Sequence, residues 1–233
     1  MITPIDFVER EYEDLKRDTI PSAVIRRMPR YYRHLELLRK KGVERVSSQK
    51  LAMRTGLTAS QIRQDLACFG EFGQQGYGYS VEGLMSEIAT ILGMKKGYTA
   101  VMVGAGRLGR ALAANFPFAR YGIHVTALYD IDPEIVGSTV CGLPVYHADS
   151  LAADLVDHPV DIGILTASVS AANELADILA ESVKGIWNFT NAELKPRIGK
   201  PVIEDIHFFD SLFSLCCTIA VEPEVPEDGR KQA

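Results

Sequence analysis

Residues 100–116 read AVMVGAGRLGRALAANF, and this stretch decides the fold of the second half of the chain. The apolar run that ends at Val103 predicts a buried strand, and the residues after the last glycine have the composition of a helix. The pattern Gly-x-Gly-x-x-Gly lies between them, where a loop can approach the pyrophosphate of a dinucleotide. At this loop and the start of the helix we expect cofactor contacts from Gly104, Ala105, Gly106, Arg107, Leu108 and Gly109.

The second strand of this fold is predicted in IHVTALYDID, residues 123–132, and it ends at Asp130. A carboxylate about 20 residues beyond the glycine pattern accepts hydrogen bonds from the adenosine ribose and disfavours a 2′-phosphate. Asp130 therefore favours NAD(H) over NADP(H). Further along, the strand-like segments VDIGILTA, GIWNFT and PVIEDI are interleaved with helix-like sequence. This alternation predicts an α/β fold, a doubly wound parallel Rossmann sheet.

The residues before the glycine pattern differ in charge from the rest of the chain. The whole chain has a formal net charge of −5, yet residues 22–79 hold eleven basic and four acidic side chains, a net of +7. The segments on both sides are acidic. A compact basic block on an acidic chain suggests a polyanionic partner for that block, and a solvated helical face is the alternative.

The basic block contains the pattern of a helix-turn-helix. SSQKLAMRTG predicts a short helix with a serine cap and a glycine end, and in LTASQIRQDLACFG the residues Thr58 and Gln61 have the spacing of a capping box. An earlier helix is expected with Pro29 in its first turn and Gly42 at its end. The second helix of such a unit enters the major groove, and a plain helical bundle is the alternative interpretation of the same pattern. The residues expected near DNA are Ser60, Gln61, Arg63 and Gln64.

A hairpin is expected after these helices. FGEFGQQGYGYSV, residues 69–81, alternates aromatic residues and glycines and would place Gln74 and Gln75 at its tip, where they could reach phosphates or the minor groove. Helix-turn-helix and hairpin together predict a winged helix. We therefore divide the chain into a winged helix-turn-helix domain over residues 1–80, an NAD(H)-binding domain over 81–205, and a C-terminal helix and tail over 206–233.

Several classes of protein are disfavoured by the composition. No apolar run reaches the roughly 20 residues needed to span a bilayer, and the acidic start lacks an apolar signal core. The four cysteines form no Cys-x-x-Cys pair and no metal cluster, so we expect buried thiols in a reducing cytoplasm. These cysteines are Cys68, Cys141, Cys216 and Cys217.

A catalytic site is not evident in the sequence. A dehydrogenase needs an acid or base beside the nicotinamide and a region that binds its substrate, and only residues 206–233 follow the last predicted strand. The dinucleotide is therefore expected to act as a signal rather than as a reactant. Two alternatives remain open: a small NAD-dependent oxidoreductase with an appended helical domain, and a binding module that responds to another adenine nucleotide.

The combination of motifs resembles the Rex family of redox-sensing transcriptional repressors, over residues 22–222. The resemblance rests on AVIRRMPRYYRHLELL, QIRQDL, FGEFGQQGYGY, VGAGRLGRAL, GIWNF and IHFFDSL. It implies a homodimer that exchanges its C-terminal helix between subunits, binds an inverted-repeat operator when free or bound to NAD⁺, and leaves the DNA when NADH binds.

The resemblance also implies roles for individual residues. Further cofactor contacts would come from Thr166, Asn188, Phe189 and Phe208, the last delivered by the partner subunit. Further DNA contacts would come from Arg27, Arg30, Tyr31, Ser48 and Tyr77. Redox coupling would involve Arg33, Phe116 and His207. Two of these depart from the family pattern, because a relative has tyrosine at the position of Phe116 and aspartate at that of His207. Many relatives are also basic where this chain has Gln64, Gln74 and Gln75.

Overall fold

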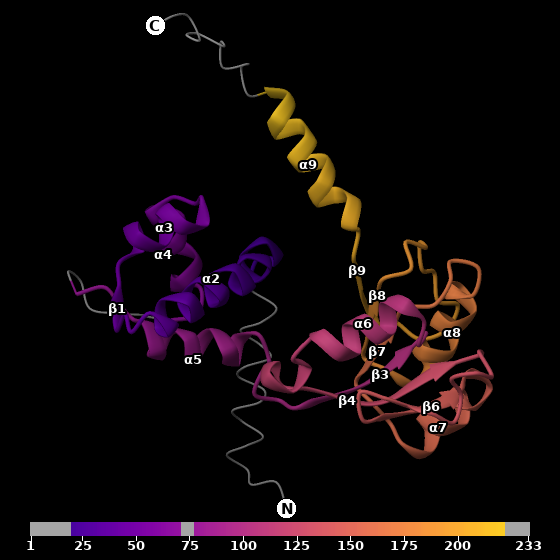
Figure 1. The fold of residues 1–233 in the computed structure, drawn as a ribbon. Coiled ribbons are helices and arrows are strands. Elements are labelled where there is room, and N and C mark those ends of the chain that lie inside the picture. Colours follow the sequence, from indigo (N-terminus) through magenta and orange to yellow (C-terminus); the bar gives the residue numbers. More distant parts are fainter. Residues whose placement is uncertain (1–19, 71–76, 222–233) are drawn as a thin grey trace, which may run out of the picture. The chain divides into compact units, whose positions relative to one another are not determined.

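The computed structural model describes residues 20–70 and 77–221 (Figure 1). The chain divides into two compact units, with the division between Lys96 and Gly97. The N-terminal unit is mainly helical, and the second unit is built on a sheet of seven strands. The two classes of structure expected for the two halves of the sequence are therefore both present.

In the N-terminal unit, the described residues 20–70 and 77–96 form four helices and a short antiparallel strand pair. Strand β1 pairs with β2, so that Arg45 lies opposite Ser80 and Val46 opposite Tyr79. The expected hairpin tip, with Gln74 and Gln75, lies outside the described residues. In chain order the elements are α2 (Ser22–Lys40), β1 (Arg45–Val46), α3 (Ser48–Thr55), α4 (Ala59–Ala67), β2 (Tyr79–Ser80) and α5 (Val81–Ile91).

The start of helix α2 differs from the prediction. Pro29 was expected in the first turn, but the helix begins at Ser22 and Pro29 lies in its interior. Proline there lacks an N–H donor and crowds the preceding turn. The helix continues because Met28 and Tyr31, on either side of this position, are buried in the core of the unit. Core packing thus outweighs the local preference of proline.

The end of α2 agrees with the prediction. Gly42 has φ +71°, in the left-handed region, and its N–H donates to Arg39 O at 2.9 Å. The next N–H, of Val43, donates to Leu38 O at 3.1 Å. These two bonds form a Schellman motif, which satisfies carbonyl groups that the end of a helix leaves without partners.

Helix α5 belongs to the N-terminal unit. Its residues Leu84 and Ile88 are buried in the same hydrophobic cluster as Met28, Leu35 and Ile62. The sequence placed a domain boundary after residue 80, whereas the compact unit extends to Lys96. The reason is the apolar face of α5, which packs on α2 and so completes the core of the helical unit.

The second unit has a doubly wound sheet with the order β5-β6-β4-β3-β7-β8-β9. All neighbouring strands are parallel except β5 and β6. From β6 to β9 this is the strand order of a Rossmann fold, and the order reverses between β3 and β7. The strands are β3 (Tyr98–Val103), β4 (Ile123–Asp130), β5 (Thr139–Val140), β6 (Leu143–His147), β7 (Ile162–Leu165), β8 (Gly185–Asn188) and β9 (Val202–Asp205).

Helices cover both faces of this sheet. Val101 and Val103 of β3 share one core with residues of α7 and α8, while Ala100 and Met102 share another with Leu112 of α6. Successive side chains of a strand point to opposite faces, so a central strand buried on both sides is apolar throughout. The helices and short 3₁₀ turns of this unit are α6 (Arg107–Asn115), η1 (Phe118–Tyr121), η2 (Ala148–Ser150), α7 (Leu151–Asp157), α8 (Ala172–Ser182) and α9 (Phe208–Val221).

The cysteines contradict the sequence-based expectation, because all four are free and exposed. Cys68 lies at the end of α4, and Cys141 stands in the turn between β5 and β6 with φ +53°. Cys216 and Cys217 lie on α9, where no residue is buried. Among the described residues, no helix is both long and apolar enough to cross a membrane. No group of metal-ligating side chains occurs among them either.

Candidate functional site

The helix-turn-helix forms with the expected caps. Ser47 Oγ accepts a hydrogen bond from the N–H of Lys50 at 3.2 Å, and α3 ends at Gly56 with φ 64°. Thr58 Oγ1 accepts from the N–H of Gln61 at 3.1 Å and so fixes the start of α4. Both helix starts are therefore set by hydroxyl side chains, and the tight turn between the helices relies on a glycine.

One face of α4 carries the polar groups expected to meet DNA. Ser60, Arg63 and Gln64 are exposed, whereas Ile62 and Leu66 are buried in the core of the unit. Arg63 Nη1 donates to Ser48 Oγ at 3.1 Å, which links this face to the start of α3. Guanidinium and amide groups can pair in a bidentate manner with guanine and adenine edges. The face therefore has the chemistry of a base-reading surface.

Three of the residues expected at DNA have other contacts. Asp65 is only 1% exposed and accepts hydrogen bonds from Arg27 Nε at 2.6 Å, Tyr31 Oη at 2.6 Å and Gln61 Nε2 at 2.8 Å. Tyr31 is itself 1% exposed, so its predicted contact with DNA is wrong for this structure. Arg27 and Gln61 are expected near DNA from the sequence, and in the structure each donates to the buried carboxylate.

The remaining candidates of this unit lie at its surface. Arg30 is exposed, and its Nη2 lies 3.7 Å from where a Cβ on Gly56 would stand. Tyr77 is 72% exposed, with the Arg45 guanidinium 5.6 Å from the centroid of its ring. Arg45 Nε also donates to Tyr77 O at 3.0 Å. The tyrosine ring is thus held beside a cation at the base of the expected wing.

The glycine loop of the second unit is shaped by contacts that exclude a side chain. Gly104, after β3, has φ +107°, and a Cβ there would lie 2.6 Å from both Ala167 N and Thr166 C. A Cβ on Gly109 would collide with the carbonyl oxygen of Gly104. The first glycine therefore allows the turn, and the third allows α6 to pack closely on the loop.

The second glycine leaves the start of α6 open. Gly106 is the N-cap of α6, makes no side-chain cap, and a Cβ on it would meet nothing within 4 Å. The N–H groups in the first turn of a helix have no partner within the helix, and they favour an anion. Arg107 is exposed and Leu108 is half-buried in this first turn. The geometry thus suits a phosphate group that approaches the backbone closely.

Asp130 stands at the end of β4, as expected, and faces the glycine loop. Its Oδ2 accepts from the N–H of Ala105 at 2.6 Å. Its Oδ1 accepts from the N–H groups of Ile131 at 2.7 Å and Asp132 at 3.0 Å. The carboxylate is therefore fixed in orientation beside the loop, and a carboxylate oxygen can accept further bonds, for example from ribose hydroxyls.

Thr166 is the first residue after β7, and Asn188 is the last residue of β8. Both lie at the carboxyl edge of the sheet. Thr166 Oγ1 donates to Gly104 O at 2.6 Å and so joins the two strands where their order reverses. Asn188 Nδ2 donates to Ala192 O at 2.9 Å and to Asp205 Oδ1 at 2.7 Å, and its Oδ1 accepts twice from Thr190. These four bonds use the capacity of the amide. A cofactor contact by the Asn188 side chain would require one of them to break.

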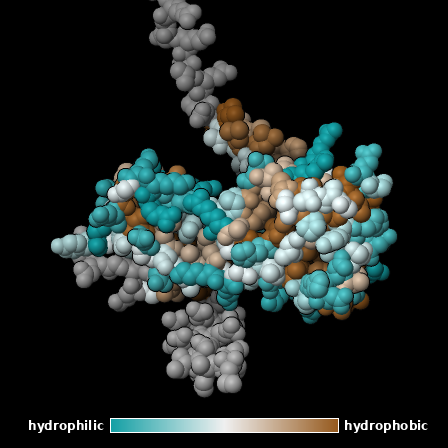
Figure 2. Space-filling view, turned by 60° about the horizontal axis from the view of Figure 1, so that its bottom comes forward, coloured by the Kyte–Doolittle hydropathy of each residue, from teal (hydrophilic) through white to brown (hydrophobic). Residues whose placement is uncertain are grey.

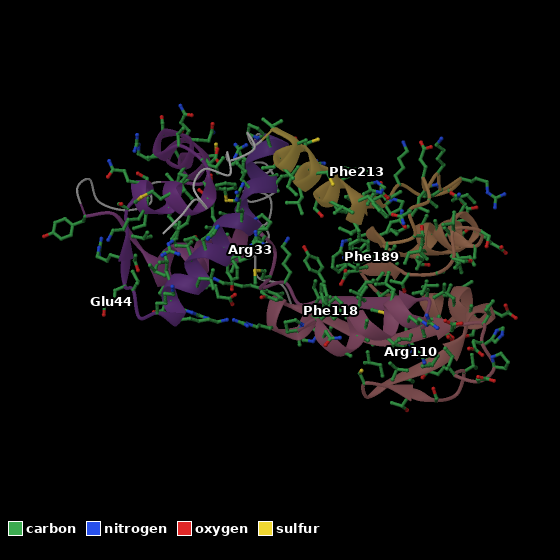
Figure 3. The ribbon with its side chains drawn as sticks, turned by 45° about the horizontal axis from the view of Figure 1, so that its top comes forward. Arg33, Glu44, Arg110, Phe118, Phe189 and Phe213 are labelled. Atoms are coloured by element: carbon green, nitrogen blue, oxygen red, sulfur yellow. The ribbon has the colours of Figure 1, made fainter. Side chains whose placement is uncertain are left out.

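An aromatic cluster lies next to this edge. Phe189 is buried, and its ring centroid lies 4.6 Å from that of Trp187 and 6.1 Å from that of Phe208. The ring centroids of Phe116 and Phe118 each lie 6.4 Å from the ring centroid of Trp187. Phe118 and Phe189, labelled in Figure 3, belong to η1 and to the segment after β8. The expected nicotinamide contact Phe208 thus packs on the Phe189 of its own chain.

Helix α9 exposes its apolar residues, which form the brown projection in Figure 2. Phe208 is 54% exposed and Phe213 61%. The three residues expected to couple the domains, Arg33, Phe116 and His207, are all exposed. Arg33 lies in the N-terminal unit, and Phe116 and His207 lie in the second. Each therefore has exposed side-chain surface that a further contact could cover.

Comparison with known proteins agrees with this architecture. Residues 19–67 match the family model described as "Putative DNA-binding protein N-terminus", and residues 95–192 match the model "CoA binding domain". The Rex repressor of Clostridium acetobutylicum is 41% identical over 205 residues, which cover 88% of this chain and 95% of the relative. That of Caldicellulosiruptor bescii is 45% identical over 86% of this chain and 92% of its own length. The chain belongs to the Rex family of redox-sensing transcriptional repressors.

Solved structures of Rex proteins superpose on this chain. The crystal structure of RSP, a Rex-family repressor, in complex with beta-NAD⁺ and operator DNA has a TM-score of 0.79 and 41% sequence identity, and covers 86% of this chain and 92% of RSP. The RSP complex with beta-NADH has the same TM-score, at 38% identity, and covers 86% of this chain and 94% of its own. The Rex fold thus extends over both units.

Sequence reasoning missed the buried carboxylate of this Rex chain. Asp65 stands four residues after Gln61, so both point to the same side of α4, and Arg27 and Tyr31 are also four apart on α2. An acidic residue inside a basic block was the signal that could have indicated a buried ion pair, because a buried charge requires a partner. The amphipathic pattern around Ile62 and Leu66 already placed position 65 next to the core.

Proposed function

We propose that this chain is a redox-sensing transcriptional repressor, which binds operator DNA as a homodimer and is released when NADH binds. The observation that carries the proposal is the presence, in one chain, of a helix-turn-helix with an exposed Ser60–Arg63–Gln64 face and a Rossmann switch point with an anion-accepting loop. The relatives named as repressors, and RSP crystallised with operator DNA and with each form of the dinucleotide, support it.

NAD(H) would bind across the carboxyl ends of β3 and β7. Gly106 and the N–H groups of Arg107 and Leu108 would meet the pyrophosphate, and Asp130 would accept bonds from the adenosine ribose. The bound group supplies a nicotinamide ring that differs between its two forms by a hydride and by the charge of the ring. Phe189, with Phe208 from either subunit, would provide the apolar surface beside that ring.

DNA would be read by α4. Ser60, Arg63 and Gln64 would meet base edges, and Ser48 and Arg30 would meet phosphates, while the tip with Gln74 and Gln75 would act as the wing. Two such helices must lie about one DNA turn apart, roughly 34 Å, to bind an inverted repeat. A dimer provides this spacing, and α9 would form its exchanged element because its apolar face needs a partner surface.

NADH would act by favouring a dimer in which that spacing is lost. A ligand shifts such an equilibrium only if it binds the two arrangements with different affinity. We place the difference at Arg33, Phe116 and His207, which would exchange contacts between the winged helix and the core. The winged-helix region, the Rossmann domain and the C-terminal helix would thus act as the three parts of one cytoplasmic switch.

A DNA-retardation experiment tests the function. The chain is first used to select its own operator from a randomised duplex library, and the shift of that operator is then titrated with NADH and with NAD⁺. Release by NADH at concentrations where NAD⁺ leaves the complex intact is expected. Failure to select any duplex, or equal release by both forms, would overturn the proposal.

The same samples discriminate against the two other functions. An oxidoreductase would consume NADH in the presence of a substrate, whereas a sensor would leave its absorbance at 340 nm constant. A module for another adenine nucleotide would respond to ATP, ADP or AMP in place of NADH. The relatives are named as repressors, and none of those reported above is named as an oxidoreductase.

A further inference from the structure

A buried carboxylate joins helix α2 of the N-terminal unit to α4, the helix expected to read DNA. Asp65 of α4 is 1% exposed, and its two oxygens accept four hydrogen bonds. Arg27 Nε and Nη2 donate at 2.6 and 2.7 Å, Tyr31 Oη at 2.6 Å, and Gln61 Nε2 at 2.8 Å. Both oxygens therefore have two donors each.

The donors come from two helices in a regular arrangement. Arg27 and Tyr31 are one turn apart on α2, and Gln61 and Asp65 are one turn apart on α4. Arg27 approaches the carboxylate with two nitrogens, which fixes the plane of the carboxylate as well as its distance. Ile62 and Leu66 hold α4 on the core by close packing, and this set of directional bonds adds a fixed rotation of the helix.

The charges are arranged so that the carboxylate stays ionised. Burial acts to raise the pKa of Asp65, but the hydrogen bonds from Arg27, Tyr31 and Gln61 outweigh it, and the pKa lies below its ordinary value. Burial and the bond to Asp65 raise the pKa of Tyr31, which therefore remains a donor. An ion pair with one buried member contributes little net stability but is costly to break, because removal of Arg27 leaves the charge of the buried Asp65 unpaired.

We propose that Asp65 is a positioning residue for DNA recognition, and that Gln61 serves this clamp and does not read a base. The clamp would fix the rotation of α4 on α2, so that Ser60, Arg63 and Gln64 face the groove together. This inference rests on the proposed DNA binding. Recognition geometry must be held closely by supporting contacts, since a recognition surface that is loose by about 1 Å loses much of its function.

The surroundings of Gln61 are the reason why we assign this residue to the clamp and not to base reading. Gln61 is half-buried, and one N–H of its amide donates to Asp65 Oδ1, which turns the side chain toward the carboxylate and fixes its orientation. Gln64 is on the next turn of the same helix and is exposed. The two glutamines have the same chemistry but different surroundings, which makes Gln64 a matched control for Gln61.

The first experiment compares base preference. The operator selected by the unaltered chain is changed one base pair at a time, and the affinity of each duplex is measured for the unaltered chain, Gln61→Met and Gln64→Met. For Gln61→Met we expect a loss of about 3–10-fold that is similar at every base pair, because the orientation of α4 loses one supporting hydrogen bond of ordinary net strength. For Gln64→Met we expect discrimination to fall at one base pair of each half-site. Loss of discrimination at a single base pair in Gln61→Met would overturn the inference.

The second experiment tests whether the donors act as one unit. Asp65→Asn keeps the volume of the side chain, and its operator affinity is compared with that of Gln61→Met and of the double variant. If the glutamine acts through Asp65, the double variant binds about as well as Asp65→Asn alone. Multiplied losses would show that the two side chains act independently and would overturn the clamp. Unchanged NADH affinity in all variants shows that the second unit is folded.

Thermal unfolding provides a test that does not depend on DNA. Tyr31→Phe removes one hydroxyl from the clamp, and its shift of the melting temperature should not add to that of Asp65→Asn. Additive shifts would overturn the clamp itself. If the unaltered chain selects no operator while the shifts are non-additive, the clamp exists but the proposed function, and the role in recognition with it, is wrong.

Discussion

The backbone N–H of Ala105 donates a hydrogen bond to Oδ2 of Asp130 at 2.6 Å. This contact joins the residue between the first two glycines of the loop to the end of the neighbouring strand. The carboxylate therefore holds the loop in shape, and in the proposed cofactor site it would also accept bonds from the adenosine ribose. Since the carboxylate serves the loop even without a cofactor, its loss changes the site before any ligand arrives.

Replacement of Asp130 by serine is expected to weaken NADH binding by about 1.5–3 kcal/mol, the usual value for hydrogen bonds to a charged group. The discrimination against NADPH should fall as well, because the negative charge that repels a 2′-phosphate is absent. Calorimetric titration with both reduced dinucleotides measures the two effects.

Asp132→Ser is the matched control for this prediction. Asp132 lies two residues away and accepts a bond from the N–H of Glu134 at 3.0 Å, outside the glycine loop. Its variant should keep both the affinity and the preference. Equal NADH affinity in Asp130→Ser and the unaltered chain would exclude Asp130 as a ribose ligand.

Arg63→Ala is expected to reduce operator affinity by about 1–3 kcal/mol, as for the loss of one bidentate base contact. Arg63 is exposed and held toward Ser48 by a 3.1 Å bond, so its removal leaves the core of the unit intact. Fluorescence anisotropy with operator and with unrelated duplexes measures the effect.

The comparison of the two duplexes assigns the contact of Arg63. A loss confined to the operator indicates base reading, and an equal loss on both duplexes indicates a phosphate contact. NADH affinity should not change, because the glycine loop belongs to the second unit. Full affinity for both duplexes would remove Arg63 from the interface.

Asp161 is expected to make the second unit sensitive to acid. Its Oδ1 accepts from Lys184 Nζ at 2.6 Å and its Oδ2 from the N–H of Thr99 at 3.0 Å, which joins the starts of three strands. The bond from Lys184, followed by that from Thr99, lowers the pKa of Asp161. A lowered pKa in the folded state means that the stabilisation is complete above the ordinary pKa and is lost as the pH falls through the folded value.

Asp161→Asn should therefore lower the free energy of unfolding by about 0.5–1 kcal/mol at pH 7, because solvent screens the bond from the largely exposed Lys184. The difference from the unaltered chain should shrink below about pH 4, where the carboxylate begins to bind a proton. Urea unfolding followed by circular dichroism at pH 7 and below pH 4 checks this, with the exposed Asp157→Asn as control. A difference that stays constant with pH would contradict the ionic origin of the effect.

Much of the fold could be predicted because its signals are local in the sequence. Ser47 and Thr58 cap the helices that they were expected to cap, and Asp130 ends the strand that it was expected to end. The expectation for Pro29 failed because burial of Met28 and Tyr31 is a property of the packed unit, which overrides a local preference. The position of α5 in the N-terminal unit was missed for a similar reason, since an apolar face does not say which core it completes.

The candidate site was less predictable than the fold. Exposed Arg63 and buried Tyr31 are both polar residues of the same basic block, and composition alone does not separate them. The four cysteines were predicted to be buried because a thiol packs readily in a core. In the structure all four are exposed, because the elements that carry them present them to solvent. Burial thus decides which polar residues are free to bind a partner, and it depends on contacts distant in sequence, such as Arg27 with Asp65.

Helix α9 should be required for dimer formation. Leu212 is 46% exposed and Phe213 61%, on a helix with no buried residue, and such an apolar surface on a free chain favours association. Leu212→Asp would place a charge within the apolar face, and its burial in a dimer without a partner is costly. We expect this variant to shift from dimer to monomer in light scattering and to lose operator affinity, because a monomer contacts one half-site only.

Ser214→Asp is the control, since Ser214 lies with Asp210 and Thr218 on the polar side of the helix. A dimer that persists in Leu212→Asp, or one that is lost equally in Ser214→Asp, would show that this face does not form the subunit contact.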